Sequence, residues 1–312
     1  MLKARVIFWV TMCISALVAV IYLSLGFSDT GMSLLFGLIE FESELNRNNP
    51  VAETLYVGLF SNFIAGIWLS VVAIILALIS CASIFPDAMD EGAAGVLVTK
   101  SLGRVGIFFT KYVGSLFFVA IQVGLFCLIV FFALRWRVGS WNPSIFWFIP
   151  IVVLVFSYIY SVLVLVAVKT RSVLVAILIA MGFWFLCALM SFGEGVLYRM
   201  KQHAEIVGGS DGLADVETIN NWHRVAKGVY GVVPKTGPTM GLADRLLVVN
   251  GERGFSNTDF LMAIFGPPDR GMPRDPDQGA ERHSVAYVLG TSLLFEGIIL
   301  SLAAWLFCRR DF

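Results

Sequence analysis

The chain has 312 residues, of which 58% are hydrophobic and only 14% are charged, and its formal net charge at pH 7 is zero. Soluble globular proteins carry about 25% charged residues, whereas this sequence contains apolar runs of roughly the 20 residues that a bilayer-spanning helix needs. Composition therefore excludes a soluble globular protein, and the balanced charge argues against a nucleic-acid partner.

Six apolar segments predict six transmembrane helices, and therefore an all-α polytopic membrane protein. The segments cover residues 6–26, 57–79, 112–134, 145–168, 173–192 and 285–307. The first is too long for a signal peptide and is followed by no clear small-residue cleavage site. The predicted organisation is a five-helix part (1–192), a large polar connector (193–284), and a last helix with its tail (285–312).

Lysine and arginine residues in the short loops orient these helices. With the N-terminus inside, the cytoplasmic set is Lys3, Arg5, Lys100, Arg104, Lys169, Arg171, Arg309 and Arg310. The outer set is smaller: Arg47, together with Arg135 and Arg137, which run against the rule. The charges of the connector are left out of this comparison, because the rule applies only to short loops. Both termini are therefore expected in the cytoplasm and the connector outside it.

Two of the outer segments carry weaker patterns. In LIEFESEL, Glu40, Glu42 and Glu44 alternate, which indicates the wet face of an interfacial segment. In the connector, LADRLLVV and TDFLMAIF are short amphipathic or apolar patches. We expect these two patches to be small helices that lie on the outer membrane surface or re-enter it.

The stretch GVLVTKSLGR, residues 95–104, contains a Lys-Ser pair like the one that ends a phosphate-binding P-loop. A P-loop needs the pattern G-x-x-x-x-G-K-[ST], because a glycine-rich turn lets backbone N–H groups surround the phosphates. Ala94 and Thr99 occupy the two glycine positions here. Nucleotide binding by this stretch is therefore not expected.

Residues 86–104 instead predict a short amphipathic helix on the cytoplasmic surface, between the second and third spans. Acidic residues cluster just after Pro86, at the helix end that favours anions. Lys100 and Arg104 lie near the opposite end, which favours cations. Apolar residues recur between them at helical spacing. Such a helix is suited to docking a partner or to lying on lipid headgroups.

Residues 83–114 resemble the membrane subunit of type-2 ABC transporters. The matching residues are Glu91, Gly92, Ser101, Arg104, Lys111 and Gly114, and the ending LFCRRDF is similar to the family's terminus. The sequence departs from the family pattern in two ways. It has no proline near KSLGR, and its connector is longer than the family commonly shows.

The resemblance implies a six-helix permease without an ATPase site of its own, and therefore a transporter subunit rather than an enzyme. A separate ATP-binding subunit would dock on the coupling helix 86–104. The docking residues implied are Glu91, Gly92, Lys100, Ser101 and Arg104. This chain would bind no cofactor, because ATP would be held by that partner.

The resemblance also implies that two permease subunits pair, as a homodimer or a heterodimer, among the lipids of the bacterial cytoplasmic (inner) membrane. Transport would be driven by ATP hydrolysis in the partner. An exporter or a membrane-remodelling machine is the expected role. The substrate is left open, with lipid, peptide, ion, sugar polymer and drug all compatible with the sequence.

Polar side chains inside the predicted spans are candidates for a translocation path. Glu296 lies in the middle of the last span, where a charged carboxylate costs about 2.5–3.5 kcal/mol on insertion scales. Hydroxyl groups run along the fourth span at Ser157, Tyr160 and Ser161, and Gln122 lies in the third. The alternative is that these groups form hydrogen bonds that hold helices together.

No metal site is predicted. The three histidines, His203, His223 and His283, are far apart in the connector, and the five cysteines form no C-x-x-C pair. No H-E-x-x-H pattern indicates an intramembrane enzyme. Two alternatives to the permease stay open: a non-transporting scaffold of an envelope complex, and a proton-coupled secondary carrier that uses Glu296.

Overall fold

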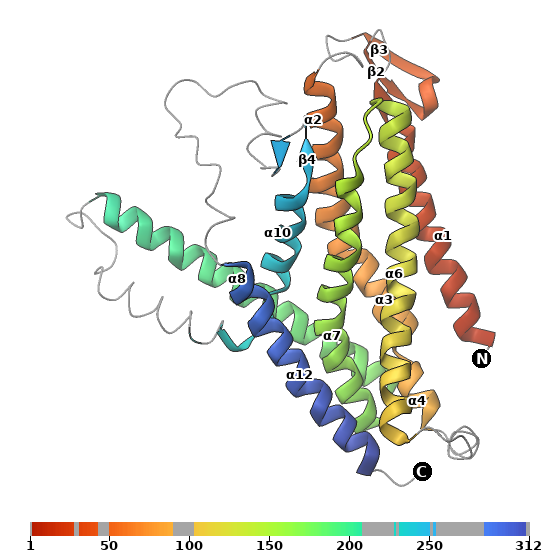
Figure 1. The fold of residues 1–312 in the computed structure, drawn as a ribbon, viewed down its shortest axis with the longest axis vertical. Coiled ribbons are helices and arrows are strands. Elements are labelled where there is room, and N and C mark those ends of the chain that lie inside the picture. Colours follow the sequence, from red (N-terminus) through yellow and green to blue (C-terminus); the bar gives the residue numbers. More distant parts are fainter. Residues whose placement is uncertain are drawn as a thin grey trace. The chain divides into compact units, whose positions relative to one another are not determined.

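The computed structural model describes residues 2–27, 31–42, 50–89, 103–207, 228, 231–249, 252–253 and 284–309, which form mainly long helices (Figure 1). Within these residues, five helical segments are long and apolar enough to cross a membrane. They are Thr54–Ala88, Arg104–Arg137, Pro143–Thr170, Val173–Gly193 and Val285–Arg309. By helix length and hydropathy the chain is therefore a multi-pass membrane protein, and the second to sixth predicted spans are confirmed as apolar helices.

The first predicted span corresponds to α1 (Leu2–Ser24), whose described apolar stretch, Trp9–Ser24, is shorter than the other five. Its crossing of the membrane stays a prediction, as does the orientation of the bundle.

The second span is built from three consecutive helices, α2 (Pro50–Leu59), η2 (Phe60–Val72) and α3 (Ala73–Cys81), followed by the short α4 (Ile84–Ala88). The middle helix η2 is a π-helix, in which hydrogen bonds close wider turns than in an α-helix.

The remaining helices extend beyond the apolar runs that predicted them. These are α6 (Arg104–Arg137), η3 (Pro143–Trp147) with α7 (Phe148–Thr170), α8 (Val173–Val207) and α12 (Val285–Arg309). The fifth span was expected to end at residue 192, but α8 continues to Val207. The polar residues that follow the apolar run are mostly good helix formers, so the helix outlasts the hydrophobic signal.

The long elements are helical as expected, and two small antiparallel sheets are also present. The first is made of β1 (Gly26–Phe27), β2 (Gly31–Leu34) and β3 (Ile39–Glu42), with the 3-10 turn η1 (Leu35–Gly37) before β3. Glu40 and Glu42 alternate with Ile39 and Phe41 along β3. This period of two is the strand pattern, which the sequence interpretation took for an interfacial segment.

The connector contains the second sheet and one long described helix. The helix α10 (Thr236–Leu246) covers most of LADRLLVV, and the two valines form β4 (Val248–Val249), which pairs with β5 (Glu252–Arg253). A small helix was expected at LADRLLVV, and the structure has one. The second patch, TDFLMAIF, lies outside the described residues.

The chain divides into two compact units. Unit 1 contains Met1–Ser83, Phe109–Phe156 and Met240–Arg282, and unit 2 contains Ile84–Phe108, Ser157–Thr239 and His283–Phe312.

The core of unit 1 is tied by hydrogen bonds between helices that are distant in sequence. The hydroxyls of Tyr22 and Tyr56 each donate to the other residue's main-chain carbonyl, at 2.9 and 3.2 Å, and their ring centroids are 4.6 Å apart. Elsewhere along α1, Ser15 Oγ accepts a hydrogen bond from Gln122 Nε2 at 3.1 Å. Hydrogen bonds of buried side chains therefore join α1 to α2 and α1 to α6.

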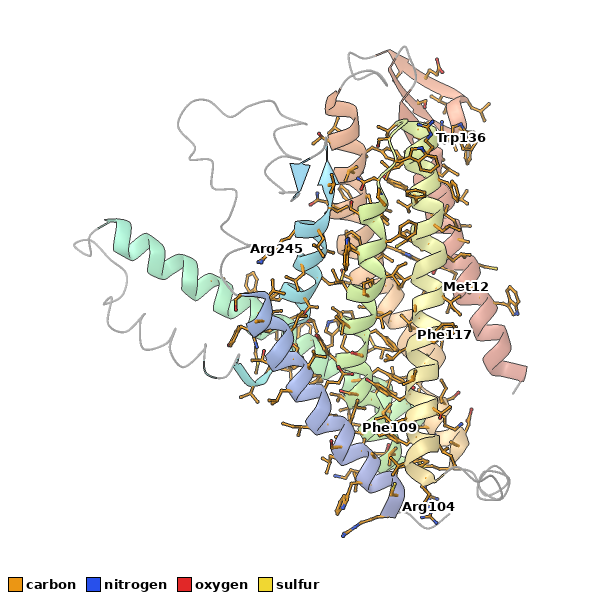
Figure 2. All side chains as sticks on the ribbon, viewed as in Figure 1. Met12, Arg104, Phe109, Phe117, Trp136 and Arg245 are labelled. Atoms are coloured by element: carbon orange, nitrogen blue, oxygen red, sulfur yellow. The ribbon has the colours of Figure 1, made fainter. Side chains whose placement is uncertain are left out.

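At one end of unit 2, three buried phenylalanines join α4, α6 and α12. The ring centroids of Phe85 and Phe108 are 5.1 Å apart, and Phe307 lies 6.3 and 5.7 Å from them. Arg104, at the start of α6, donates from Nη1 to the carbonyl oxygen of Cys308 at 3.0 Å. Figure 2 shows Arg104 beside the end of α12.

Candidate functional site

A buried carboxylate joins α7 to α12 in unit 2. Glu296 in α12 is only 8% exposed, and Ser157 Oγ in α7 donates to its Oε2 at 3.0 Å. The structure thus brings together two residues that the sequence analysis proposed for a translocation path. A hydroxyl donor lowers the free energy of a carboxylate that would otherwise be buried among apolar side chains.

The connector reaches the same helix through Lys235, which is fully buried. Its backbone N–H donates to Ser292 Oγ at 2.9 Å, and its Nζ donates to Thr291 Oγ1 at 2.6 Å. The ammonium group also lies 4.5 Å from the ring centroid of Tyr287. All three partners belong to α12, so this one residue fixes the connector to the helix that carries Glu296.

Helical spacing arranges these groups on α12 as two same-face pairs. Ser292 and Glu296 are four residues apart, and so are Tyr287 and Thr291, which places the members of each pair one turn apart on α12. Thr291 Oγ1 also donates to the Tyr287 carbonyl at 2.7 Å. The outcome is two polar pairs on different sides of a helix that is otherwise largely apolar.

One buried hydroxyl in this cluster has no hydrogen-bond partner among the described residues. Tyr158 in α7 is fully buried next to Thr239 and Ser292, yet none of their polar atoms lies in hydrogen-bonding geometry with its oxygen. Thr239 Oγ1 instead donates to the carbonyl of Lys235 at 2.7 Å. An unpaired buried hydroxyl costs about 1–3 kcal/mol, and it is available to donate or accept one further bond.

Burial also affects the charge of the lysine. It lowers the pKa of the Lys235 amine to about 8, because the cationic form loses its hydration there. The amine therefore titrates closer to neutral pH than an exposed lysine does. The cluster combines a carboxylate, hydroxyls and an amine of lowered pKa, groups that can exchange protons or bind a polar solute.

The other predicted path residues lie elsewhere. Ser161 Oγ donates to the Tyr158 carbonyl within α7 at 2.8 Å, and Tyr160 is buried in the same helix. Gln122 belongs to unit 1, where it bonds to Ser15. Ser157 and Glu296 are thus the members of the predicted path set between which the structure shows a hydrogen bond.

The predicted coupling helix is described only at its two ends. Residues Ile84–Ala88 form α4 and Arg104 begins α6, whereas Glu91, Gly92, Lys100 and Ser101 lie outside the described residues. Arg104 was expected to contact a partner subunit. In the structure it donates to the end of α12, and its contact with a partner subunit stays a prediction.

Sequence reasoning missed five residues of the polar cluster: Lys235, Thr239, Tyr287, Thr291 and Ser292. Ser292 had a usable signal, since it precedes Glu296 by one helical turn. Lys235 and Thr239 lie in the turn-rich stretch PKTGPT, where composition indicates a loop and carries no sign that it packs on a distant helix.

Among the described residues, no three histidine, cysteine, aspartate or glutamate side chains lie close enough to hold a metal ion. No protein-family model, curated protein or solved structure matches the chain.

Proposed function

We propose that the chain is the permease subunit of an ABC transporter, driven by a separate ATP-binding subunit docked on residues 86–104. In this proposal both termini and that segment face the bacterial cytoplasm, two permease subunits pair, and the protein exports its substrate or remodels the membrane. The sequence resemblance around residues 91–114 supports the family. The observation that carries the mechanism is the link from this loop to α12.

The two ends of the loop are fixed to the same helix. Phe85 and Phe108 flank the loop and pack on Phe307, and Arg104 bonds to the carbonyl of Cys308. A push on the loop would therefore move α12, and with it the buried side chain of Glu296. Rigid-body displacement of packed helices is a common way to transmit such a movement.

The first test is purification of the tagged chain from its native cells in mild detergent. We expect an ATP-binding-cassette subunit to accompany it, and the ATP hydrolysis rate of that subunit to change on reconstitution with the chain. Lys100→Glu should weaken this association. The matched control is Lys169→Glu, which reverses an exposed charge in the last turn of α7, also expected to face the cytoplasm. Equal behaviour of the two variants, or the lack of such a subunit, contradicts the proposal.

The second test concerns the link to α12. Phe108→Leu removes one ring from the three-phenylalanine cluster, whereas Phe109→Leu changes the neighbouring residue, which is exposed on α6 (Figure 2). We expect Phe108→Leu to reduce the stimulation of ATP hydrolysis at unchanged partner binding, and Phe109→Leu to leave it near wild type. Loss of stimulation in both variants, or in neither, would argue against the link.

A proton-coupled carrier is a second candidate, favoured by the buried bond between Ser157 and Glu296. It predicts proton uptake by liposomes that contain the purified chain alone under an imposed pH gradient. Glu296→Gln keeps an acceptor for Ser157 but cannot ionise, so it should abolish the uptake. Uptake that survives in the glutamine variant rules this candidate out.

A further inference from the structure

Arg137, at the end of α6 in unit 1, is a buried cation. Its side chain is 8% exposed, and its Nε donates to the carbonyl oxygen of Leu23 at 2.9 Å. Its guanidinium carbon lies 5.5 Å from the ring centroids of both Phe36 and Trp136. Nη2 is buried and has no acceptor among the described residues. In the part of the chain that the structure describes, Arg137 makes no ion pair.

In the described part of the chain, the buried guanidinium of Arg137 lacks a hydrogen-bond acceptor for Nη2. The guanidinium stays protonated under all ordinary conditions, so it cannot relieve its burial by losing a proton. Its planar array of donors matches the oxygens of a phosphate or a carboxylate. An anionic group supplied from outside the chain would provide the acceptor that Nη2 lacks.

The rings beside the guanidinium are open to the surroundings. Trp136 is 63% exposed and Phe36 is 48% exposed, so an incoming group can pack against both rings. Figure 2 shows Trp136 at the end of α6, next to the sheet β1–β3. Phe36 has a positive φ of 63°, a strained conformation for a residue other than glycine. Local structure thus holds this ring in place at an energetic cost.

The surroundings have the composition of a membrane interface. Tryptophan is enriched at the headgroup level of membrane proteins, and two further exposed tryptophans, Trp141 and Trp147, lie just after α6. The sheet region exposes apolar side chains at Leu35, Leu38, Ile39 and Phe41. Apolar side chains, aromatic rings and a cation together suit a ligand with acyl chains and an anionic head.

We infer that Arg137 binds the phosphate group of a phospholipid, with Phe36 and Trp136 enclosing the headgroup. The inference uses unit 1 alone and does not depend on the proposed transport function. It also accounts for one of the two outer arginines that break the charge rule: Arg137 is a buried ligand-binding residue rather than a solvated loop charge.

The test measures the binding of short-chain phosphatidylglycerol to the purified, delipidated chain by native mass spectrometry. We expect Arg137→Gln to weaken binding at least about tenfold, the loss expected for one charge-assisted hydrogen bond. The matched control is Arg135→Gln, an exposed arginine two residues away that bonds to the Gly139 carbonyl at 2.5 Å. It should change binding less than about twofold.

Two competitors identify the ligand. Millimolar inorganic phosphate should not displace the lipid; if it does, the site takes free phosphate and the headgroup assignment is wrong. A galactolipid of equal chain length should bind more weakly, because it lacks the phosphate. Equal binding of the galactolipid would mean that the rings and the apolar surface, not Arg137, hold the lipid.

A second variant guards against misfolding of Arg137→Gln. A methyl group added at Gly26 would lie 2.6 Å from Arg137 Cδ, so Gly26→Ala displaces the guanidinium without removing its charge. We expect this variant to fold, as judged by circular dichroism, and to bind phosphatidylglycerol more weakly. Wild-type binding by folded Gly26→Ala would overturn the inference, as would wild-type binding by Arg137→Gln.

Discussion

Each of the two units uses an arginine to satisfy the carbonyl end of a helix, but in different surroundings. In unit 1, Arg137 donates to Leu23 in the last turn of α1, and in unit 2, Arg104 donates to Cys308 in the last turn of α12. Carbonyls in a last turn have no partner inside the helix, and that end favours a cation. Arg137 is buried, whereas Arg104 is exposed.

This difference in burial determines how much each hydrogen bond contributes to the stability of the fold. Water competes for an exposed donor and acceptor, so replacing Arg104 leaves its carbonyl partner hydrated. Water has little access to the buried pair, so the loss of Arg137 leaves an unsatisfied carbonyl. Lys235 is a third case, because a buried amine can release its proton where a guanidinium cannot.

The largest expected effect is that of Arg137→Gln. It removes one charged hydrogen bond and two ring contacts, and it should destabilise the chain by about 2–4 kcal/mol. Thermal unfolding in detergent micelles provides the measurement, with Arg135→Gln as the exposed control. Similar melting temperatures for the two variants would remove the distinction between buried and exposed arginine.

Gly26→Ala should have the next largest effect. The new methyl group meets the Arg137 side chain, which must shift from its bond to Leu23, at a cost of about 1–2 kcal/mol. Gly182→Ala in α8 is the control, because a methyl group there meets nothing within 4 Å and should be neutral or stabilising. Combined with Arg137→Gln, Gly26→Ala should add little. Additive losses would show that it acts elsewhere.

Arg104→Gln should destabilise the chain by less than about 1 kcal/mol, because water replaces the lost donor at this exposed helix end. The same thermal measurement applies. A loss as large as that of Arg137→Gln would show that the contact with Cys308 is shielded from solvent and would abolish the contrast between the units.

Lys235→Met should show its effect in the pH dependence of stability rather than at a single pH. The folded-state pKa of about 8 lies below the ordinary value of 10.5, so between these values the unfolded chain binds the proton and the folded chain does not. This contribution to stability therefore rises with pH across that window and is lost as pH falls through 8. The methionine variant should lack this rise of stability with pH. If stability depends on pH in the same way in the variant and the wild type, the lowered pKa of Lys235 is refuted.

Hydropathy located the helices well, because an apolar run of about 20 residues matches the thickness of a bilayer and is uncommon in soluble folds. Hydropathy predicted the ends of the helices less accurately. The helix α8, for example, continues through polar residues to Val207. In the site, Glu296 was found because a carboxylate is conspicuous in an apolar run. Lys235 was not, because its burial results from packing between segments more than 50 residues apart, and local sequence carries no record of such a contact.

The wide turns of η2 have a consequence for how this chain can vary. A π-turn holds more residues than an α-turn, so one residue can be lost from Phe60–Val72 by tightening a single turn. The flanking Tyr56 and Ala77, both buried, would then keep the sides they present to their neighbours. Length changes are normally confined to loops, and here the interior of an apolar helix can absorb them without rotating either of its ends.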